Sequence, residues 1–498
     1  MRRLLALTAA FMLLGLLAAP AALAAVDGYE YAYTYTYDYW EDMRESPDAY
    51  RARLMISGGS LGIPGGLKAP QGLFVRGEDI YICDTGNNRV LQLRLTDSGA
   101  EVVRVIDAFQ GDTSPLTFSS PRDIYVTEEG DLFIADFNNN RVVRLDRDLN
   151  WKLSFTKPTD ATFDQSVSFL PKKLVADVSG RVYALAQNVN KGLIKFEADG
   201  SFTGYIGASK VRYTWYDSIW RLLSTKEQRA QQEAFVPTEY DNVALDQDGF
   251  FYVVTRTFSE NDLRSGQAEP VRRLNAIGDN ILVENGSSYV IGDLQWAPGN
   301  TNITNSGPSK FVDVTVLQDD IYMVLDSTHN RIFGYDQQGN LLWAFGGVGN
   351  SDGFFNRPVA IEHMGLELLI LDEAGSLTVM TPTEYGRLVY QAIGEYRRGE
   401  YEASAASWTK VLAQNGNFDS AYVGIGRALL QEEKYEDAMR YFKTALDRKN
   451  YSEAWRLRRM EIVEDNIGLI FAVVAVLLVA PPLWRRIRKV IWEVKQAS

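Results

Sequence analysis

The feature that most constrains the fold of this chain is a repeat of about 50 residues along its middle part. Pro70 opens one clear copy and Pro121 opens the next. In both copies the proline precedes a short apolar run, and a second run ends in Asp and is followed by an Asn-Asn-Arg sequence. Further copies begin at Pro171, Pro237, Pro308 and Pro358. The sequence therefore contains six similar units.

Each unit is rich in short alternating or β-branched runs. Turns such as Ala198-Asp199-Gly200 and Gln337-Gln338-Gly339 separate these runs. The pattern indicates four β-strands in each unit. Six four-stranded units form a six-bladed β-propeller. We therefore predict an all-β six-bladed propeller, followed by a small all-α domain and one transmembrane helix.

The loop after the second strand of a unit carries the motif Asp-x-x-Asn-Asn-Arg. The motif is complete at residues 84–89 and 136–141, and His329 replaces one Asn at residues 326–331. It decays elsewhere, as where Ala186 and Leu377 replace its Asp and its Arg. The motif resembles the NHL repeat, and this resemblance implies an NHL-type propeller. We expect the loops to be structural, because Asp and Asn satisfy turn amides and Arg pairs with a neighbour.

The two ends of the repeat region predict how the ring closes. The sixth unit lacks its outermost strand, and residues 50–59 resemble the end of unit five at residues 341–347. We therefore predict that this N-terminal strand completes blade six, which removes an open sheet edge. The predicted propeller domain spans residues 49–382.

After the propeller the pattern changes to helical spacing. Residues 419–452 place aromatic and small residues in a 34-residue frame that resembles a TPR repeat, and a second copy begins at Tyr385. Two repeats leave core exposed, so the helix that follows should cap them. TPR repeats and a capping helix are thus predicted for residues 383–465.

Both ends of the chain read as membrane-targeting segments. Residues 1–24 have the charged start, apolar run and small-residue cleavage site of a signal peptide. A Tyr-rich lead follows at residues 25–48 and predicts an extended strand on a surface or an exposed arm. Residues 466–484 predict a transmembrane helix that ends near Pro481 and Pro482. The basic residues 485–498 should form a cytoplasmic tail, which leaves the rest extracytoplasmic on a single-pass cell-membrane protein.

Charge and composition exclude several classes of protein. The net charge is −13, and the basic residues at both ends leave the middle more acidic still, so we expect no nucleic acid partner. Cys83 is the only cysteine and cannot form an intramolecular disulfide. Two histidines cannot furnish a three-His zinc site. No cofactor and no catalytic residue are predicted.

The candidate ligand-binding residues are cations beside the prolines that open the units. Inner strands of a propeller start at one mouth of its central channel, where a ring of cations could bind an anionic ligand or partner group. The alternative is that each cation pairs with an acid in an adjacent blade. The cations are Lys68, Arg122, Lys172, Lys310 and Arg357.

Two tryptophans complete the set of candidate ligand-binding residues. Trp215 and Trp220 lie in an insertion between Gly207 and Pro237 that reads as an amphipathic helix. It could pack on the side of the propeller, line a pocket or touch the bilayer surface. The sequence leaves these alternatives open.

The predicted function is that of a membrane-anchored binding scaffold. The chain resembles bacterial extracytoplasmic NHL propellers fused to TPR repeats and a membrane anchor. This resemblance implies protein partners on the propeller face and the TPR region, with association with sugar-uptake ABC transporter components. A carbohydrate or anionic ligand is the second class of partner that we expect. The alternative is a metal-dependent, lactonase-like hydrolase whose channel carboxylates, Asp123, Glu239 and Asp313, would hold a divalent ion.

Overall fold

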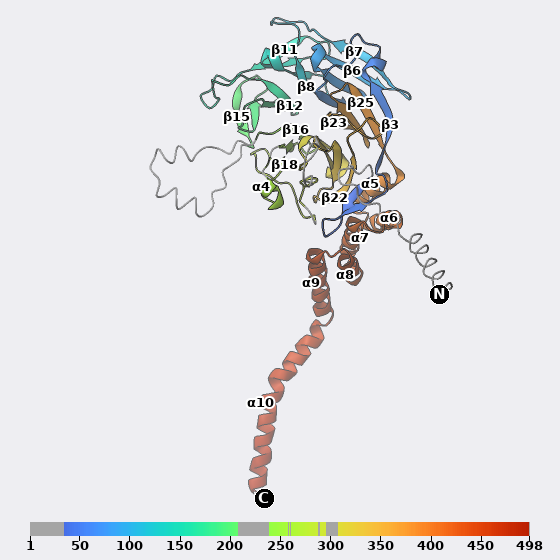
Figure 1. Ribbon diagram of the computed structural model, residues 1–498. Coiled ribbons are helices and arrows are strands. Elements are labelled where there is room, and N and C mark those ends of the chain that lie inside the picture. The colour runs from blue at the N-terminus through green and yellow to red at the C-terminus, as the bar shows by residue number, and fades with distance from the viewer. Residues whose placement is uncertain are drawn as a thin grey trace, which may run out of the picture.

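A β-propeller, a helical region and a long C-terminal helix make up the structure (Figure 1). The computed structural model describes residues 34–207, 239–256, 258, 260–286, 289–294 and 307–497. The predicted signal peptide, the first part of the Tyr-rich lead, Trp215 and Trp220 lie outside the described residues.

The first three blades each consist of four antiparallel strands. Blade one contains β4 (Gly72–Arg76), β5 (Asp79–Asp84), β6 (Arg89–Leu95) and β7 (Ala100–Ile106). Blade two contains β8 (Pro121–Val126), β9 (Leu132–Asp136), β10 (Arg141–Leu145) and β11 (Trp151–Thr156). Blade three contains β12 (Pro171–Ala176), β13 (Val182–Ala186), β14 (Leu193–Phe196) and β15 (Phe202–Ile206).

Blade four departs from the predicted four strands. It contains β16 (Asn242–Leu245), β17 (Phe251–Val254) and β18 (Val271–Leu274), and no fourth strand pairs with β18 in the described part of the chain. After β18 the chain turns at Asn275, and the described residues that follow pair with β18 through one isolated bridge, between Leu274 and Asn280. An inserted segment that includes α4 (Glu260–Arg264) separates β17 from β18. The described part of this unit therefore has three paired strands, where the sequence predicts four.

Blades five and six both use N-terminal strands. Blade five contains β19 (Phe311–Val316), β20 (Tyr322–Asp326), β21 (Arg331–Tyr335) and β22 (Leu341–Gly346), and the hairpin of β1 (Tyr35–Tyr37) and β2 (Met43–Glu45) extends its outer edge. Blade six contains β23 (Pro358–Met364), β24 (Glu367–Asp372), β25 (Ser376–Pro382) and β3 (Tyr50–Ser57).

The pairing of β3 with β25 closes the ring. It is antiparallel and runs from Tyr50 opposite Pro382 to Ser57 opposite Ser376. The inner strands also contact one another all the way around, in the order β4, β8, β12, β16, β19, β23 and back to β4. The structure therefore confirms both the six-bladed propeller and the predicted N-terminal strand in blade six.

The loop motifs fold as tight structural turns. In blade one, Asp84 accepts hydrogen bonds from the Asn87 amide and from Arg89, and its Oδ1 accepts one from the Lys68 backbone. The second Asn of the motif has a left-handed backbone, with φ 56° at Asn88, and Asn tolerates that conformation better than most residues. The motif is therefore part of the scaffold, as its repetition predicted.

A bundle of antiparallel helices packs on the edge of blades five and six. Its helices are α5 (Glu384–Arg397), α6 (Tyr401–Gln414), α7 (Asp419–Gln431), α8 (Tyr435–Thr444) and α9 (Arg448–Asp465). Trp343 of β22 and Tyr390 of α5 belong to one continuous core, and the Tyr50 and Tyr390 hydroxyls lie 2.6 Å apart. The propeller and the first helices are thus joined by buried apolar contact, whereas α9 extends away from it (Figure 1).

The last helix, α10 (Ile467–Ala497), is longer than predicted. It is the one described helix that is long and apolar enough to cross a membrane. It does not end at the two prolines, because Pro481 and Pro482 lie inside it and the basic tail continues as helix. A proline lacks one backbone donor, and the flanking helical residues here tolerate that loss.

Candidate functional site at the channel mouth

A cavity of about 460 Å³ opens where the inner strands of the propeller begin. Residues from all six blades line it, so it lies on the axis of the ring. The polar residues of its lining are, in blade order, Gln71, Arg122, Lys172, Lys173, Asp241, Arg256, Ser327, Asn330, Asn356, Arg357 and Glu373. Five cations therefore face two carboxylates in a chain whose overall charge is negative.

Arg122 differs from the other cations of this mouth. Its guanidinium carbon lies 3.5 Å from the centre of the Phe137 ring, which fixes its direction, and no acidic group in the described residues pairs with it. Its Nε is buried without a hydrogen-bond partner in the described structure. Burial lowers the pKa of Arg122, and no carboxylate offsets that effect. An oriented, partly desolvated guanidinium of this kind suits a carboxylate or phosphate ligand.

The other cations of the mouth have acidic partners. Lys172 Nζ lies 3.0 Å from Glu239, and Arg357 lies 3.2 Å from Glu373 with most of its side chain exposed. Lys173 lies 3.7 Å from Asp123, deeper in the channel. These pairs hold the cations in place, and pairs at an exposed site are weak enough to be exchanged for a ligand.

Lys68 and Lys310 are exposed and are not part of the cavity lining. The strand pairing gives the register of the cations on the inner strands. Pro121, Pro358 and Phe311 occupy one register position, because each pairs with the last residue of the second strand of its blade. Arg122 follows that position by one residue, whereas Lys310 and Arg357 both precede it by one, so register separates Arg122 from Lys310 but does not separate Lys310 from Arg357. Cations that look alike in the sequence thus occupy different places on the rim.

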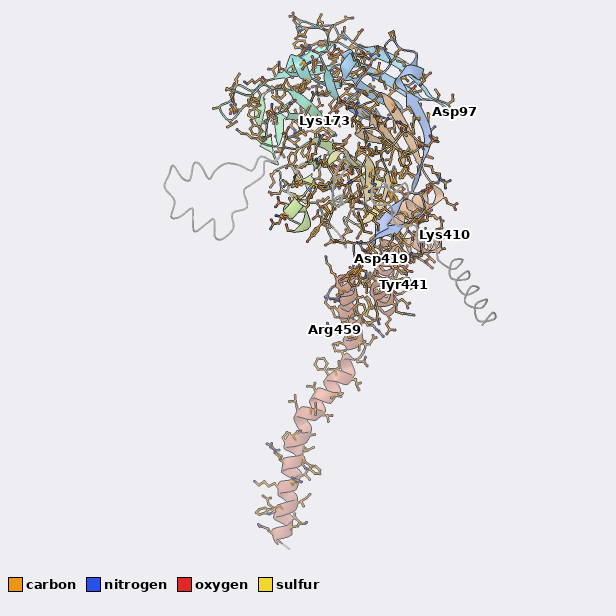
Figure 2. All side chains as sticks on the ribbon, in the orientation of Figure 1. Asp97, Lys173, Lys410, Asp419, Tyr441 and Arg459 are labelled. Atoms are coloured by element: carbon orange, nitrogen blue, oxygen red, sulfur yellow. The ribbon has the colours of Figure 1, made fainter. Side chains whose placement is uncertain are left out.

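The floor of the mouth is a buried polar layer. Asp313 accepts hydrogen bonds from the Asn242 amide and from the backbone N–H groups of Val314 and Ile361. Burial raises the pKa of Asp313 to about 7, although the charge of Lys173 and the backbone donors lower it. Lys173 lies within the propeller (Figure 2).

The carboxylates proposed for a lactonase-type ion do not fit one. Asp123 faces the Lys173 ammonium, Glu239 faces Lys172, and Asp313 is held by an amide and two backbone donors. In the described residues these carboxylates do not converge on one point. A lysine between channel carboxylates takes the place that a cation would need. We derive no metal-dependent step for this channel.

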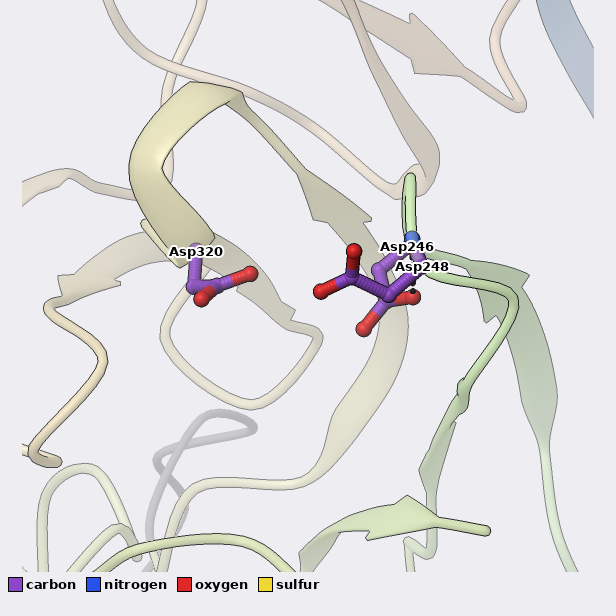
Figure 3. A group of neighbouring side chains, drawn as sticks. All are labelled: Asp246, Asp248 and Asp320. Carbon is purple, nitrogen blue, oxygen red and sulfur yellow. Dashed lines mark hydrogen bonds between the residues drawn. The ribbon is translucent and has the colours of Figure 1, made fainter. Parts of the chain in front are cut away.

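One acidic cluster elsewhere has metal-like spacing. Asp246, Asp248 and Asp320 bring carboxylate oxygens within 4.8 Å of one another (Figure 3). Arg273 lies between them, 2.5 Å from Asp246 and 3.5 Å from Asp320. Asp246 also accepts the backbone N–H of Asp248, as in a tight turn between two strands. Arg273 therefore forms ion pairs with all three carboxylates of this cluster.

Sequence reasoning missed several residues of the cavity. Arg256 follows β17 in blade four, at the place where other blades carry the Asp-x-x-Asn-Asn-Arg loop. That unit has no recognisable motif, so no signal in the sequence marked Arg256. Asn330 was visible as the last Asn of the blade-five motif, and its amide holds the backbone carbonyls of Phe355 and Asn356.

Comparison with known proteins agrees with the NHL assignment. The NHL repeat family matches residues 118–145. NHL repeat-containing protein 3 of Mus musculus is 29% identical over 166 residues, which cover 29% of this chain and 46% of that protein. The match thus spans less than half of the relative's length. The chain contains an NHL repeat within its six-bladed propeller.

Solved structures with similar folds share little sequence with this chain. A virginiamycin B lyase from Staphylococcus aureus is 11% identical, with a TM-score of 0.38, and covers 66% of this chain and 98% of its own. A protein of unknown function from Bacteroides thetaiotaomicron is 12% identical, with a TM-score of 0.42, and covers 69% and 78%. The strand pairing described above is what establishes the propeller here.

Proposed function

We propose that this protein is a membrane-anchored binding scaffold whose propeller binds an acidic segment of a protein partner at the channel mouth. The observation that carries the proposal is Arg122, a guanidinium oriented by Phe137 and without an acidic partner in the described residues. It lies in an axial cavity where cations outnumber carboxylates. Charge complementarity of this kind guides and orients a partner more than it adds affinity.

A protein segment suits this mouth better than a small metabolite. The cavity is open to the rim, and Arg357 at its edge is exposed, so a chain that crosses the mouth can reach both Arg357 and Arg122. Glu and Asp side chains present carboxylates that an arginine binds in bidentate fashion. A carbohydrate acid offers the same group, and the experiment below separates the two sources.

The helical region and α10 supply the second half of the proposal. We assign α5–α8 as two TPR hairpins that dock a membrane-proximal partner, α9 as their cap and α10 as the anchor. The basic end of α10 lies in the cytoplasm and the propeller outside, following a cleaved signal at residues 1–24. The family resemblance narrows the partner to components of a sugar-uptake ABC transporter.

The binding proposal is tested with a labelled hexaglutamate peptide and the purified full chain in detergent. Arg122→Gln should weaken peptide binding by about tenfold, because one charge-assisted contact is lost. Lys310→Gln is the matched control, since it removes an exposed cation outside the cavity lining and should leave binding unchanged. Equal effects of the two substitutions, or none for Arg122→Gln, would contradict the proposal.

Two further measurements sharpen this test. Arg122→Gln should leave the free energy of unfolding within about 1 kcal/mol of wild type, because the change breaks no ion pair. Binding of glucuronate in place of hexaglutamate would assign the mouth to a carbohydrate acid. Loss of affinity with rising salt is expected for either ligand.

The topology is tested on intact cells that carry an epitope after Ser498. Protease added outside should release a fragment with the propeller and the helical bundle and should leave the epitope protected. Protection of the propeller instead would reverse the proposed orientation.

A further inference from the structure

The end of α10 has two chemically different faces. Helical spacing places Leu483, Ile487, Val490, Ile491 and Val494 along one side. The rest of the circumference carries Trp492 and the cations Arg485, Arg486, Arg488, Lys489 and Lys495. Glu493 is the only acid in this stretch, and it lies 3.9 Å from Lys489. This part of the helix is therefore amphipathic and strongly basic.

The apolar side is uncovered in the structure. The exposed fractions of Ile487, Val490, Ile491 and Val494 are 42%, 57%, 51% and 63%. No described residue of another element packs against them. A continuous apolar stripe of this kind on a helix marks a surface that binds something apolar.

The length of α10 determines where this stripe lies. The helix has 31 residues, which corresponds to about 46 Å, whereas a bilayer hydrocarbon core is about 30 Å thick. The uncharged part from Ile467 to Trp484 is about 27 Å long, which is within the range of helix lengths that span a bilayer. The amphipathic stripe therefore begins where the proposed span leaves the membrane, at the level of the lipid headgroups.

Two prolines provide the place where the helix can change direction. Pro481 and Pro482 lie inside α10 and lack the backbone donors that would bond to the carbonyls of Leu477 and Leu478. Helices bend at such sites. A bend here lets the following turns tilt from the membrane normal toward the membrane plane, with Trp484 at the interface.

We propose that residues 484–496 form an interfacial helix that binds anionic phospholipid headgroups of the inner leaflet. The apolar side enters the outer part of the hydrocarbon, and the cations contact the headgroups. Continuity with the span and the excess of cations over acids both favour a lipid surface over a soluble partner. This inference rests on the membrane anchor of the proposed function and adds a lipid specificity to it.

The test uses the full chain in vesicles with an environment-sensitive NBD label on one introduced cysteine. The native Cys83 is buried and does not compete for the label. Val494→Cys places the label on the apolar side, and Gln496→Cys is the matched position on the polar side. In vesicles that contain phosphatidylglycerol, dithionite should reduce the label at residue 494 about tenfold more slowly than the label at residue 496.

A charge variant then tests the role of the cations. With Arg485, Arg486, Arg488 and Lys489 all changed to Gln, the chain should still float with vesicles, but the protection of residue 494 should be lost. In vesicles of phosphatidylcholine alone the unchanged helix should also lose most of that protection.

The possible outcomes separate this inference from the anchor. Equal reduction rates at residues 494 and 496 in a chain that floats with vesicles would overturn the interfacial helix alone. Equal protection with and without phosphatidylglycerol would overturn the anionic headgroup. Failure of the full chain to float with any vesicle would overturn the anchor and this inference together.

Discussion

Arg331 donates a hydrogen bond to Asp293, a residue outside its own loop, and both side chains are buried. The equivalent Arg89 and Arg141 bond instead to the aspartate of their own motifs. In blade five the side chain next to the motif aspartate is that of His329, whose Nδ1 lies 2.9 Å from the Asp326 carboxylate. The motif in which His replaces one Asn is thus also the motif whose arginine bonds to an aspartate outside its own loop.

Asp293 joins three separate segments of the chain. Its carboxylate also accepts hydrogen bonds from the hydroxyls of Tyr35 and Tyr37 on β1. We predict that Asp293→Ala lowers the free energy of unfolding by about 3–5 kcal/mol, because it removes the carboxylate to which the buried Arg331 is bonded. Urea denaturation measures the loss, and the exposed Asp42→Ala is the control. Similar free energies for the two variants would show that Asp293 is dispensable.

The clasp in blade six predicts opposite results for two neighbouring residues. Ile56 of β3 is 2% exposed and packs in the core of blades six and one, whereas Met55 is 45% exposed on the other side of the strand. Ile56→Ala should cost about 2–5 kcal/mol of stability, and Met55→Ala should change it by less than about 0.5 kcal/mol. A small effect at Ile56, measured by thermal unfolding, would argue against a clasp that supports the ring.

The sequence predicts the ring because the repeat and its missing strand are local patterns. The six prolines that open the units can be counted in the sequence, and the similarity of residues 50–59 to residues 341–347 indicated which strand closes the ring. The blade at Pro237 was counted, but its three-stranded sheet and its cavity residue Arg256 were not predicted, because its motif has decayed and its loops are long. The span of α10 was predicted, but its continuation past Pro481 was not, since proline usually ends a helix.

The candidate site was only partly predictable. Arg122, Lys172 and Arg357 line one cavity, whereas Lys310 does not. The inner strand of unit five opens at Phe311 and not at Pro308, so Lys310 follows the proline but precedes the strand. Register of this kind depends on strand pairing and cannot be read from a proline alone. The Tyr-rich lead gave a period-2 signal, but its contact with Asp293 joins residues far apart in sequence.

The contact of α5 with the propeller predicts that the two parts are stabilised together. Tyr390 is buried, contacts the Tyr50 hydroxyl and lies edge-on to Trp343, with ring centres 5.3 Å apart. Tyr390→Ala should lower the free energy of unfolding by about 3–5 kcal/mol. Tyr451→Ala, on an exposed part of α9, serves as the control. A thermal transition of the propeller that is unchanged in Tyr390→Ala would mean that the helices fold independently.

Asp313 predicts how stability depends on pH. Burial raises the pKa of Asp313 to about 7 in the folded protein, whereas an unfolded chain gives an Asp its ordinary value near about 4. Between these two values the folded state binds a proton that the unfolded state has released. Stability from this group is therefore complete below about pH 4 and is lost as the pH rises through about 7, by up to roughly 4 kcal/mol.

Asp313→Asn keeps the side chain neutral, so its free energy of unfolding should fall less between about pH 5 and about pH 8 than that of wild type. Asn introduces donors toward Val314 and Ile361, so the variant should be less stable at every pH, and only the slope tests the prediction. Urea denaturation across this range measures it, with the exposed Asp97→Asn as the control that should follow wild type. Parallel curves for wild type and Asp313→Asn would place the pKa of Asp313 in its ordinary range.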